Sequence, residues 1–141
     1  MGARFTTSAA IRIGRRLEEI GLLFYEEPVR PENTEALAKV RAALSVPICV
    51  GERRHARCGF RDLIAAQAAD MIMPDVVRIG RIAETKKIAA LAESYYIQVA
   101  AHNPNSPVST LASLHVMANI PNACCWSTWI ASRIRPGAAT C

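Results

Sequence analysis

The chain has 141 residues, of which 51% are hydrophobic, 21% charged and 6% aromatic, a composition that excludes intrinsic disorder and collagen-like repeats and is typical of a soluble globular domain. The 17 basic and 12 acidic residues leave a formal net charge of +5. The basic residues are scattered except for Arg53, Arg54, Arg57 and Arg61. This cluster is either a solvated face or a site for an acidic small molecule. The sequence has neither the interleaved aromatic residues nor the second basic stripe that would favour nucleic-acid binding.

No membrane or secretory segment is expected. The longest stretch without Asp, Glu, Lys or Arg runs from Ser94 to Ser132, but His102 and the prolines and asparagines after it interrupt the stretch. No apolar signal segment follows Met1. The 5 cysteines include no CxxC spacing and indicate neither a disulfide framework nor a zinc site. We therefore expect a cytoplasmic protein with no nucleic-acid or membrane partner.

Helical and strand-like segments alternate along the chain. Helices are expected over 8–19, 31–44, 60–67, 82–94 and 108–118, and short apolar strands over 22–25, 46–50, 71–73 and 97–101. In the fourth helix, Ile82, Ile88 and Leu91 are expected to face inward. Apolar strands that are each followed by a helix predict an α/β fold with a parallel sheet covered on both faces.

Four polar residues stand at the ends of these strands: Glu26, Glu52, Asp75 and His102. The intervals between them are close to the length of one βα unit. Each residue alone is explained as a helix cap or a satisfied loop residue. Together they indicate one site, because the carboxyl ends of the strands of a βα-barrel converge on a single mouth.

The residue types suit removal of a proton from a carbon beside a carboxylate. Glu26 and Glu52, on adjacent strands, form a carboxylate pair that suits a hard cation such as Mg²⁺. A cation there would stabilise the charge of the enediolate that forms. Asp75 would fix the tautomer of His102 and leave its other nitrogen to accept the proton.

Three further residues are candidate contacts to the substrate. Arg53 and Arg57 could hold a substrate carboxylate or hydroxyls, although solvated arginines explain them equally well. Asn103 could reach sugar hydroxyls, but the run from Asn103 to Pro107 is also ordinary turn chemistry.

Several motifs carry a family resemblance. They are Tyr25-Glu26-Glu27-Pro28, Val50-Gly51-Glu52-Arg53, Met73-Pro74-Asp75, Ile79-Gly80 and Ala101-His102-Asn103-Pro104-Asn105. In order and spacing they resemble the barrel domain of the mandelate racemase/muconate lactonizing enzyme branch of the enolase superfamily, and within it the galactonate dehydratase-like acid-sugar dehydratases. The resemblance implies a (β/α)8 TIM barrel, Mg²⁺ on Glu26 and Glu52, and His102 with Asp75 as the catalytic dyad. It gives Glu27 a structural place beside the ligands.

The resemblance also implies that the chain is a fragment. The family's third metal ligand, an Asp, would lie one residue before Met1, and Gly2 stands where the family has a histidine. Residues 1–122 are then expected to form about the second half of the barrel, with roughly five strands and without the N-terminal capping domain. The intact parent would be a homo-oligomer that dehydrates a sugar acid, and this chain would have little activity. Two alternatives stay open: a non-catalytic fragment that binds metal weakly or associates with a homologue, and a racemase or cycloisomerase with the same site.

The residues after Asn122 depart from the family, which has a glutamate at the position of Ser127. Read with a shift of one base, Cys124, Cys125 and Trp126 encode two leucines preceded by an apolar residue. Trp126 and Ser127 then encode Glu if the serine codon is AGY. We interpret residues 123–141 as out-of-frame translation, an interpretation that a TCN codon at Ser127 would contradict.

Overall fold

The computed structural model describes residues 5–128, in which helices and strands alternate. The helices are α1 (Thr7–Glu18), α2 (Thr34–Ala42), α3 (Ala56–Ala65), α4 (Arg81–Glu93) and α5 (Pro107–Met117). The strands are β1 (Tyr25–Glu26), β2 (Ile48–Val50), β3 (Met71–Ile72), β4 (Gln98–Asn103) and β5 (Ala123–Thr128). None of the helices in these residues is long and apolar enough to cross a lipid bilayer.

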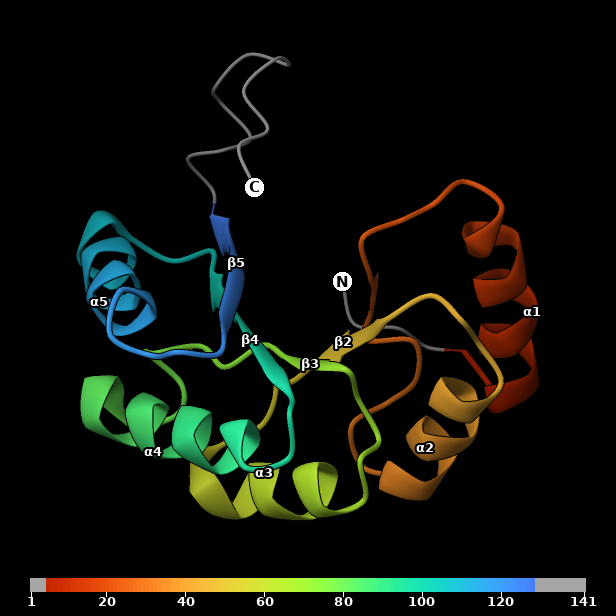
Figure 1. The fold of residues 1–141 in the computed structure, drawn as a ribbon, viewed down its shortest axis with the longest axis horizontal. Coiled ribbons are helices and arrows are strands. Elements are labelled where there is room, and N and C mark those ends of the chain that lie inside the picture. Colours follow the sequence, from red (N-terminus) through yellow and green to blue (C-terminus); the bar gives the residue numbers. More distant parts are fainter. Residues whose placement is uncertain (1–4, 129–141) are drawn as a thin grey trace.

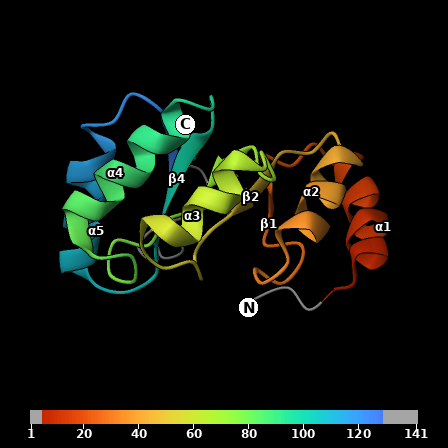
Figure 2. The ribbon, with the colours of Figure 1, turned by 90° about the horizontal axis from the view of Figure 1, so that it is seen from below.

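The five strands form one parallel sheet in the order β1-β2-β3-β4-β5. The sheet bends into an arc, and the helices lie along its outer side (Figure 1). In the view from below, α2, α3 and α4 again lie on the outer side of the strands (Figure 2). This arrangement is part of a (β/α)8 barrel and confirms the predicted fold class. The expectation that helices cover both faces of the sheet is wrong, because the inner face of a barrel is filled by side chains of its own strands.

Alternation along the strands divides the core into two layers. On β2, Ile48 and Val50 belong to the large cluster between the sheet and the helices, together with Phe60 and Ile64 of α3. Cys49 points the other way. It packs on the inner face in a cluster whose other members are Met71, Met73 and Ala100, with Phe24 and Cys125 against them. The inner layer thus forms the floor below the carboxyl ends of the strands.

The helices begin where side chains cap them. The Asn33 side chain accepts a hydrogen bond from the Ala36 amide at 2.9 Å, so α2 begins at Thr34 and not at Pro31. Ser106 and Ser109 form a capping box with Pro107 in the first turn of α5. A cap satisfies amide groups that have no partner within the helix, and therefore sets the starting residue.

Some strand and helix details differ from expectation. Leu22 and Leu23 are exposed and precede β1, which pairs with β2 only through Tyr25 and Glu26. An apolar run alone did not reveal that the pairing is so short. Ile82, expected to face inward, is 42% exposed at the start of α4, whereas Ile88 is buried. His102 lies within β4 and not after it.

Candidate active site at the carboxyl ends of the strands

The sheet brings the four predicted strand-end residues to one edge. Glu26 is the last residue of β1, and Glu52 follows β2 after Gly51. Asp75 follows β3, and its backbone forms an isolated parallel bridge with His102 of β4. Because the strands are parallel and in sequential order, their carboxyl ends lie at the same edge of the sheet, and all four residues are found there.

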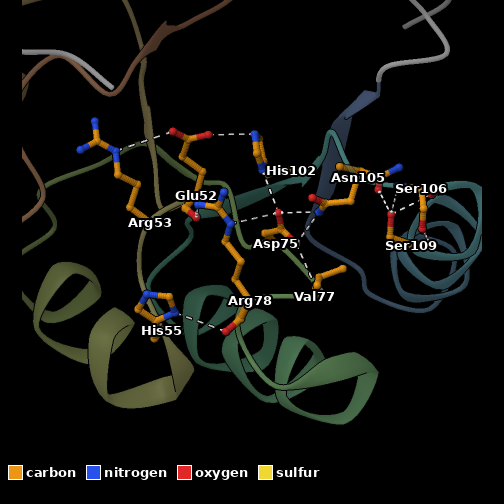
Figure 3. Close-up of polar contacts among 11 residues, drawn as sticks. Glu52, Arg53, His55, Asp75, Val77, Arg78, His102, Asn105, Ser106 and Ser109 are labelled. Carbon is orange, nitrogen blue, oxygen red and sulfur yellow. Dashed lines mark hydrogen bonds and ion pairs between the residues drawn. The ribbon is translucent and has the colours of Figure 1, made fainter. Parts of the chain in front are cut away.

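Asp75 and His102 form a buried hydrogen-bonded pair. His102 Nδ1 lies 3.1 Å from Asp75 Oδ2, and the Asp75 side chain is fully buried (Figure 3). Asp75 also accepts hydrogen bonds from the Val77 amide at 2.9 Å and from Asn105 Nδ2 at 3.0 Å. Burial alone would raise the pKa of Asp75, but these hydrogen bonds, led by the one from His102, outweigh burial and lower it. Asp75 is therefore held as a carboxylate that accepts the Nδ1 proton.

Glu52 faces the other nitrogen of the same imidazole. Its Oε2 lies 2.8 Å from His102 Nε2, and its Oε1 lies 3.7 Å from Nε of Arg53. Figure 3 shows this continuous line of contacts from Arg53 through Glu52 and His102 to Asp75. The Glu52 and His102 side chains are only 17% and 10% exposed. One largely buried imidazole is therefore flanked by two carboxylates.

Glu26, Glu52 and His102 also satisfy the geometry of a cation site. One ligand atom from each of the three lies within 4.8 Å of the others. Two carboxylates supply the hard oxygen donors that Mg²⁺ prefers, and the imidazole is the softer member of the set. Glu26 is exposed, so its carboxylate is accessible to an incoming ion. The donor chemistry of the two glutamates fits a magnesium ion.

Two expected substrate contacts lie elsewhere. Arg57 sits in the first turn of α3 and pairs with Glu84 of α4, with 2.8 Å between Arg57 Nε and Glu84 Oε1. Asn103 is 1% exposed, and both ends of its amide are occupied by α5. Its Nδ2 donates to Thr110 at 2.7 Å and its Oδ1 accepts from Ser109 at 2.6 Å. We assign neither residue to the substrate.

The other members of the arginine cluster also have structural partners. Arg54 donates to the carbonyl oxygens of Gly59 and Pro31 and to the hydroxyl of Thr34. Arg61 pairs with the neighbouring Asp62. Of the four clustered arginines, Arg53 is the one whose ion pair leads to the site.

Two side chains contact Asp75 in a way that was not predicted from the sequence. One is Asn105, whose Nδ2 donates to the Asp75 carboxylate. Arg78 lies three residues after Asp75, with its Nε 3.8 Å from Asp75 Oδ2 and its Nη1 3.3 Å from the carbonyl oxygen of Glu52. Arg78 lies in the turn that begins at Asp75, where its amide donates to the Asp75 carbonyl oxygen, and an arginine three residues after a strand-end aspartate was the available signal.

The last described strand carries the position at which the family has a glutamate. Parallel pairing of β4 and β5 places Ser127 opposite His102 in the register. Ala123–Thr128 of the proposed out-of-frame segment thus extends the sheet, and residues 129–141 lie outside the described residues. The reading-frame interpretation stays a prediction.

Fold and site together define part of a (β/α)8 barrel whose strand ends carry a hydrogen-bonded Asp–His pair beside two glutamates. The sequence matches the family described as Enolase C-terminal domain-like over residues 1–133. The chain belongs to this enolase-type barrel family.

Several named proteins are similar to this chain in sequence or in structure. D-xylonate dehydratase of Haloferax volcanii is 44% identical over 119 residues, which are 84% of this chain and 29% of that protein. D-galactonate dehydratase of Xanthomonas oryzae is 40% identical over 102 residues, 72% of this chain and 27% of that protein. The crystal structure of a mandelate racemase/muconate lactonizing enzyme-like protein from Rubrobacter xylanophilus superposes with a TM-score of 0.86 at 48% identity. It covers 90% of this chain and 32% of that one. The chain thus spans about a third of the length of the relatives it matches.

Proposed function

We propose that this site, in the intact parent protein, dehydrates a sugar acid by removing the proton from the carbon next to its carboxylate. The observation that carries the proposal is the line of contacts from Asp75 through His102 to Glu52, with Glu26 beside it. The names of the relatives, dehydratases of D-xylonate and D-galactonate, support the same substrate class and reaction.

His102 is the proposed base, and Asp75 is its partner. Asp75 accepts the Nδ1 proton, which leaves the lone pair of the neutral ring on Nε2. Nε2 then takes the proton from the substrate carbon. In the dehydration, the electrons of that C–H bond form a carbon–carbon double bond while the hydroxyl group on the neighbouring carbon leaves with the electrons of its C–O bond, and it is released as water after taking a proton from the solvent. Nε2 is available to the substrate only when the Glu52 carboxylate is held elsewhere, as it would be when Glu52 is a cation ligand.

Glu26 and Glu52 are the proposed magnesium ligands. When bound, the ion would supply positive charge that offsets the negative charge developing on the substrate carboxylate. Arg53 is the proposed substrate contact, because its guanidinium lies beside Glu52 and is not engaged by a neighbouring helix as Arg57 is. A guanidinium can bind a carboxylate or adjacent hydroxyls in a forked geometry.

We place the intact protein in the cytoplasm as a homo-oligomer. Cys49, Cys58 and Cys124 are free thiols, as is usual in a reducing compartment. The chain by itself is expected to turn over little, because the described residues contribute only two carboxylates to the cation site. The alternative remains a non-catalytic fragment that at most binds metal weakly or associates with an intact homologue.

The test assays the chain, and the parent protein if the flanking DNA encodes one, against a panel of sugar acids with Mg²⁺. His102→Ala and Glu52→Gln are expected to lower any dehydration by about a hundredfold or more. His115→Ala and Glu35→Gln, both at exposed positions outside the site, are the matched controls and should leave it unchanged.

Other results would redirect the proposal. Dehydration that survives in His102→Ala contradicts the assigned base. Racemisation or cyclisation in the same panel would favour the alternative reactions that begin with the same proton removal. Isothermal titration that detects no Mg²⁺ binding, together with no turnover, would favour the inert fragment.

A further inference from the structure

Glu27 is a buried carboxylate that the proposed chemistry does not use. It directly follows Glu26 at the end of β1 and is 3% exposed. Its Oε1 accepts a hydrogen bond from the Gly51 amide at 2.7 Å, while its own amide donates to the Cys49 carbonyl oxygen at 3.0 Å. One residue at the end of β1 thus holds the end of β2 through both its side chain and its backbone.

The backbone at both ends of this contact is unusual. Glu27 has a φ of +43° and Gly51 a φ of +136°. A Cβ on Gly51 would come within 2.8 Å of the Phe60 ring and 3.1 Å of the Met73 amide nitrogen. Gly51 is therefore wedged against α3 and the end of β3, so the group to which Glu27 binds has little freedom to move.

The hydrogen bond joins the residues that stand next to the two proposed magnesium ligands in the sequence. Glu26 precedes Glu27, and Glu52 follows Gly51, so each ligand is one peptide bond from an end of the contact. β1 contributes only two paired residues to the sheet. A strand end held by so few ladder hydrogen bonds needs another restraint if its carboxylate is to stay at a fixed distance from Glu52.

We propose that Glu27 is a positioning residue whose hydrogen bond to the Gly51 amide sets the separation of Glu26 and Glu52, and with it the placing of Glu52 against His102. Glu27 does not touch the cation. It acts through the backbone, as an acceptor, so an uncharged side chain of the same length that keeps the acceptor can replace it. The metal-binding part of the inference rests on the proposed function, but the placing of Glu52 does not.

The test compares two variants of similar volume in the full chain. Glu27→Gln keeps an acceptor for Gly51, and Glu27→Met removes it; Glu32→Gln and Glu32→Met, at an exposed position five residues away, are the controls. We expect Mg²⁺ affinity, measured by isothermal titration, to fall by about tenfold or more in Glu27→Met and to stay close to wild type in Glu27→Gln.

A second readout does not depend on the metal. In ¹⁵N-labelled protein without Mg²⁺, at one fixed pH, we follow the Gly51 amide and the His102 imidazole nitrogens. Glu27→Met should abolish the hydrogen-bond shift of the Gly51 amide and move the Nε2 resonance as Glu52 leaves it. Glu27→Gln should preserve both signals, and their loss in folded Glu27→Gln overturns the positioning role even if Glu27→Met fails to fold.

The outcomes separate this inference from the proposed function. If Glu27→Gln weakens Mg²⁺ binding as much as Glu27→Met while the Gly51 amide is unchanged, the charge of Glu27 matters and the positioning role is overturned. An unchanged Nε2 resonance in folded Glu27→Met overturns it as well. If Glu26→Gln leaves Mg²⁺ binding unaltered, the metal assignment fails instead, and the two resonances still decide the role of Glu27.

Discussion

Gly51 has a backbone conformation that few other residues could adopt in its place. Because of its φ of +136° and the nearby Phe60 ring, Gly51→Ala introduces both backbone strain and a clash. We expect the free energy of unfolding, measured by urea denaturation, to fall by about 2 kcal/mol or more. Gly59→Ala in α3 is the control, because its Cβ would have only an ordinary contact at 3.5 Å from Arg54. An equal loss in both variants would show that Gly51 is not special.

Asp75 couples the stability of the protein to pH. Its folded-state pKa is lowered, so the ionised form stabilises the fold; this stabilisation is complete above the ordinary pKa of about 3.9 and is lost as the pH falls through the lower folded-state value. Urea unfolding across the acidic range should therefore show a steeper loss of stability in the wild type than in Asp75→Asn. The exposed Asp62→Asn is the control. Parallel curves for wild type and Asp75→Asn would contradict the prediction.

The place that the backbone gives a candidate residue can be predicted from the sequence, but the direction of a side chain that distant partners bind cannot. Glu26, Glu52, Asp75 and His102 are placed by strand ends, which apolar runs reveal. Arg57 turns away because Glu84, on the next helix, binds it. In the same way α5 binds Asn103, while Asn105 reaches Asp75, and nothing local to either asparagine distinguishes them.

At the scale of elements, the start of α5 supports the end of β4 at Asn103 and the loop that carries Asn105. Ser106 caps this helix and is joined to Ser109 in a reciprocal pair of hydrogen bonds. Ser106→Ala should lower the free energy of unfolding by about 1 kcal/mol. Ser94→Ala, at the exposed end of α4, should change it by less than about 0.5 kcal/mol. Chemical denaturation of both variants checks this, and equal values would argue against the cap.

The segment that forms β5 is the one for which we propose a shifted reading frame. Its register sets Ser127 opposite His102, and the restored frame would place a glutamate at this register position. We expect resequencing to show an AGY serine codon at position 127 and one base missing near codon 123. A TCN codon, or a related intact gene with the same Cys-Cys-Trp segment, would contradict the interpretation.

Element boundaries were predictable only in part. The existence and order of the five helices and of β1 to β4 followed from apolar runs and their intervals, and the structure confirms them, whereas β5 was not among the strands expected from these runs. The exact ends depend on pairing and capping, such as the two-residue ladder of β1 and the Asn33 cap of α2. These are set by partners that an apolar pattern does not encode.

For the whole molecule, the open sides of the sheet are the main liability. Within residues 5–128, β1 pairs only with β2 and β5 only with β4, so each leaves one side of its backbone without a strand partner. Unpaired parallel edges favour association with other chains. We expect light scattering coupled to size exclusion to show oligomers that grow with concentration. A monomer at all concentrations would contradict this.

A charged residue introduced on the unpaired edge of β5 tests whether the oligomers form through that edge. Cys124 is exposed on β5, and Cys124→Lys should shift the population towards monomer because a lysine disfavours edge pairing. Cys58→Lys, at an exposed position on α3, is the control and should leave the distribution unchanged. The same shift in both variants would point to net charge and not to the edge.

The sequential strand order has a consequence for how the sheet assembles. Every strand pairs with the strand nearest to it along the chain, so each pairing closes a loop of about the same length and the entropic cost does not rise as the sheet grows. No early strand has to wait for a distant partner. The sheet can therefore add one βα unit after another in the order of synthesis, with each docked unit serving as the template for the next.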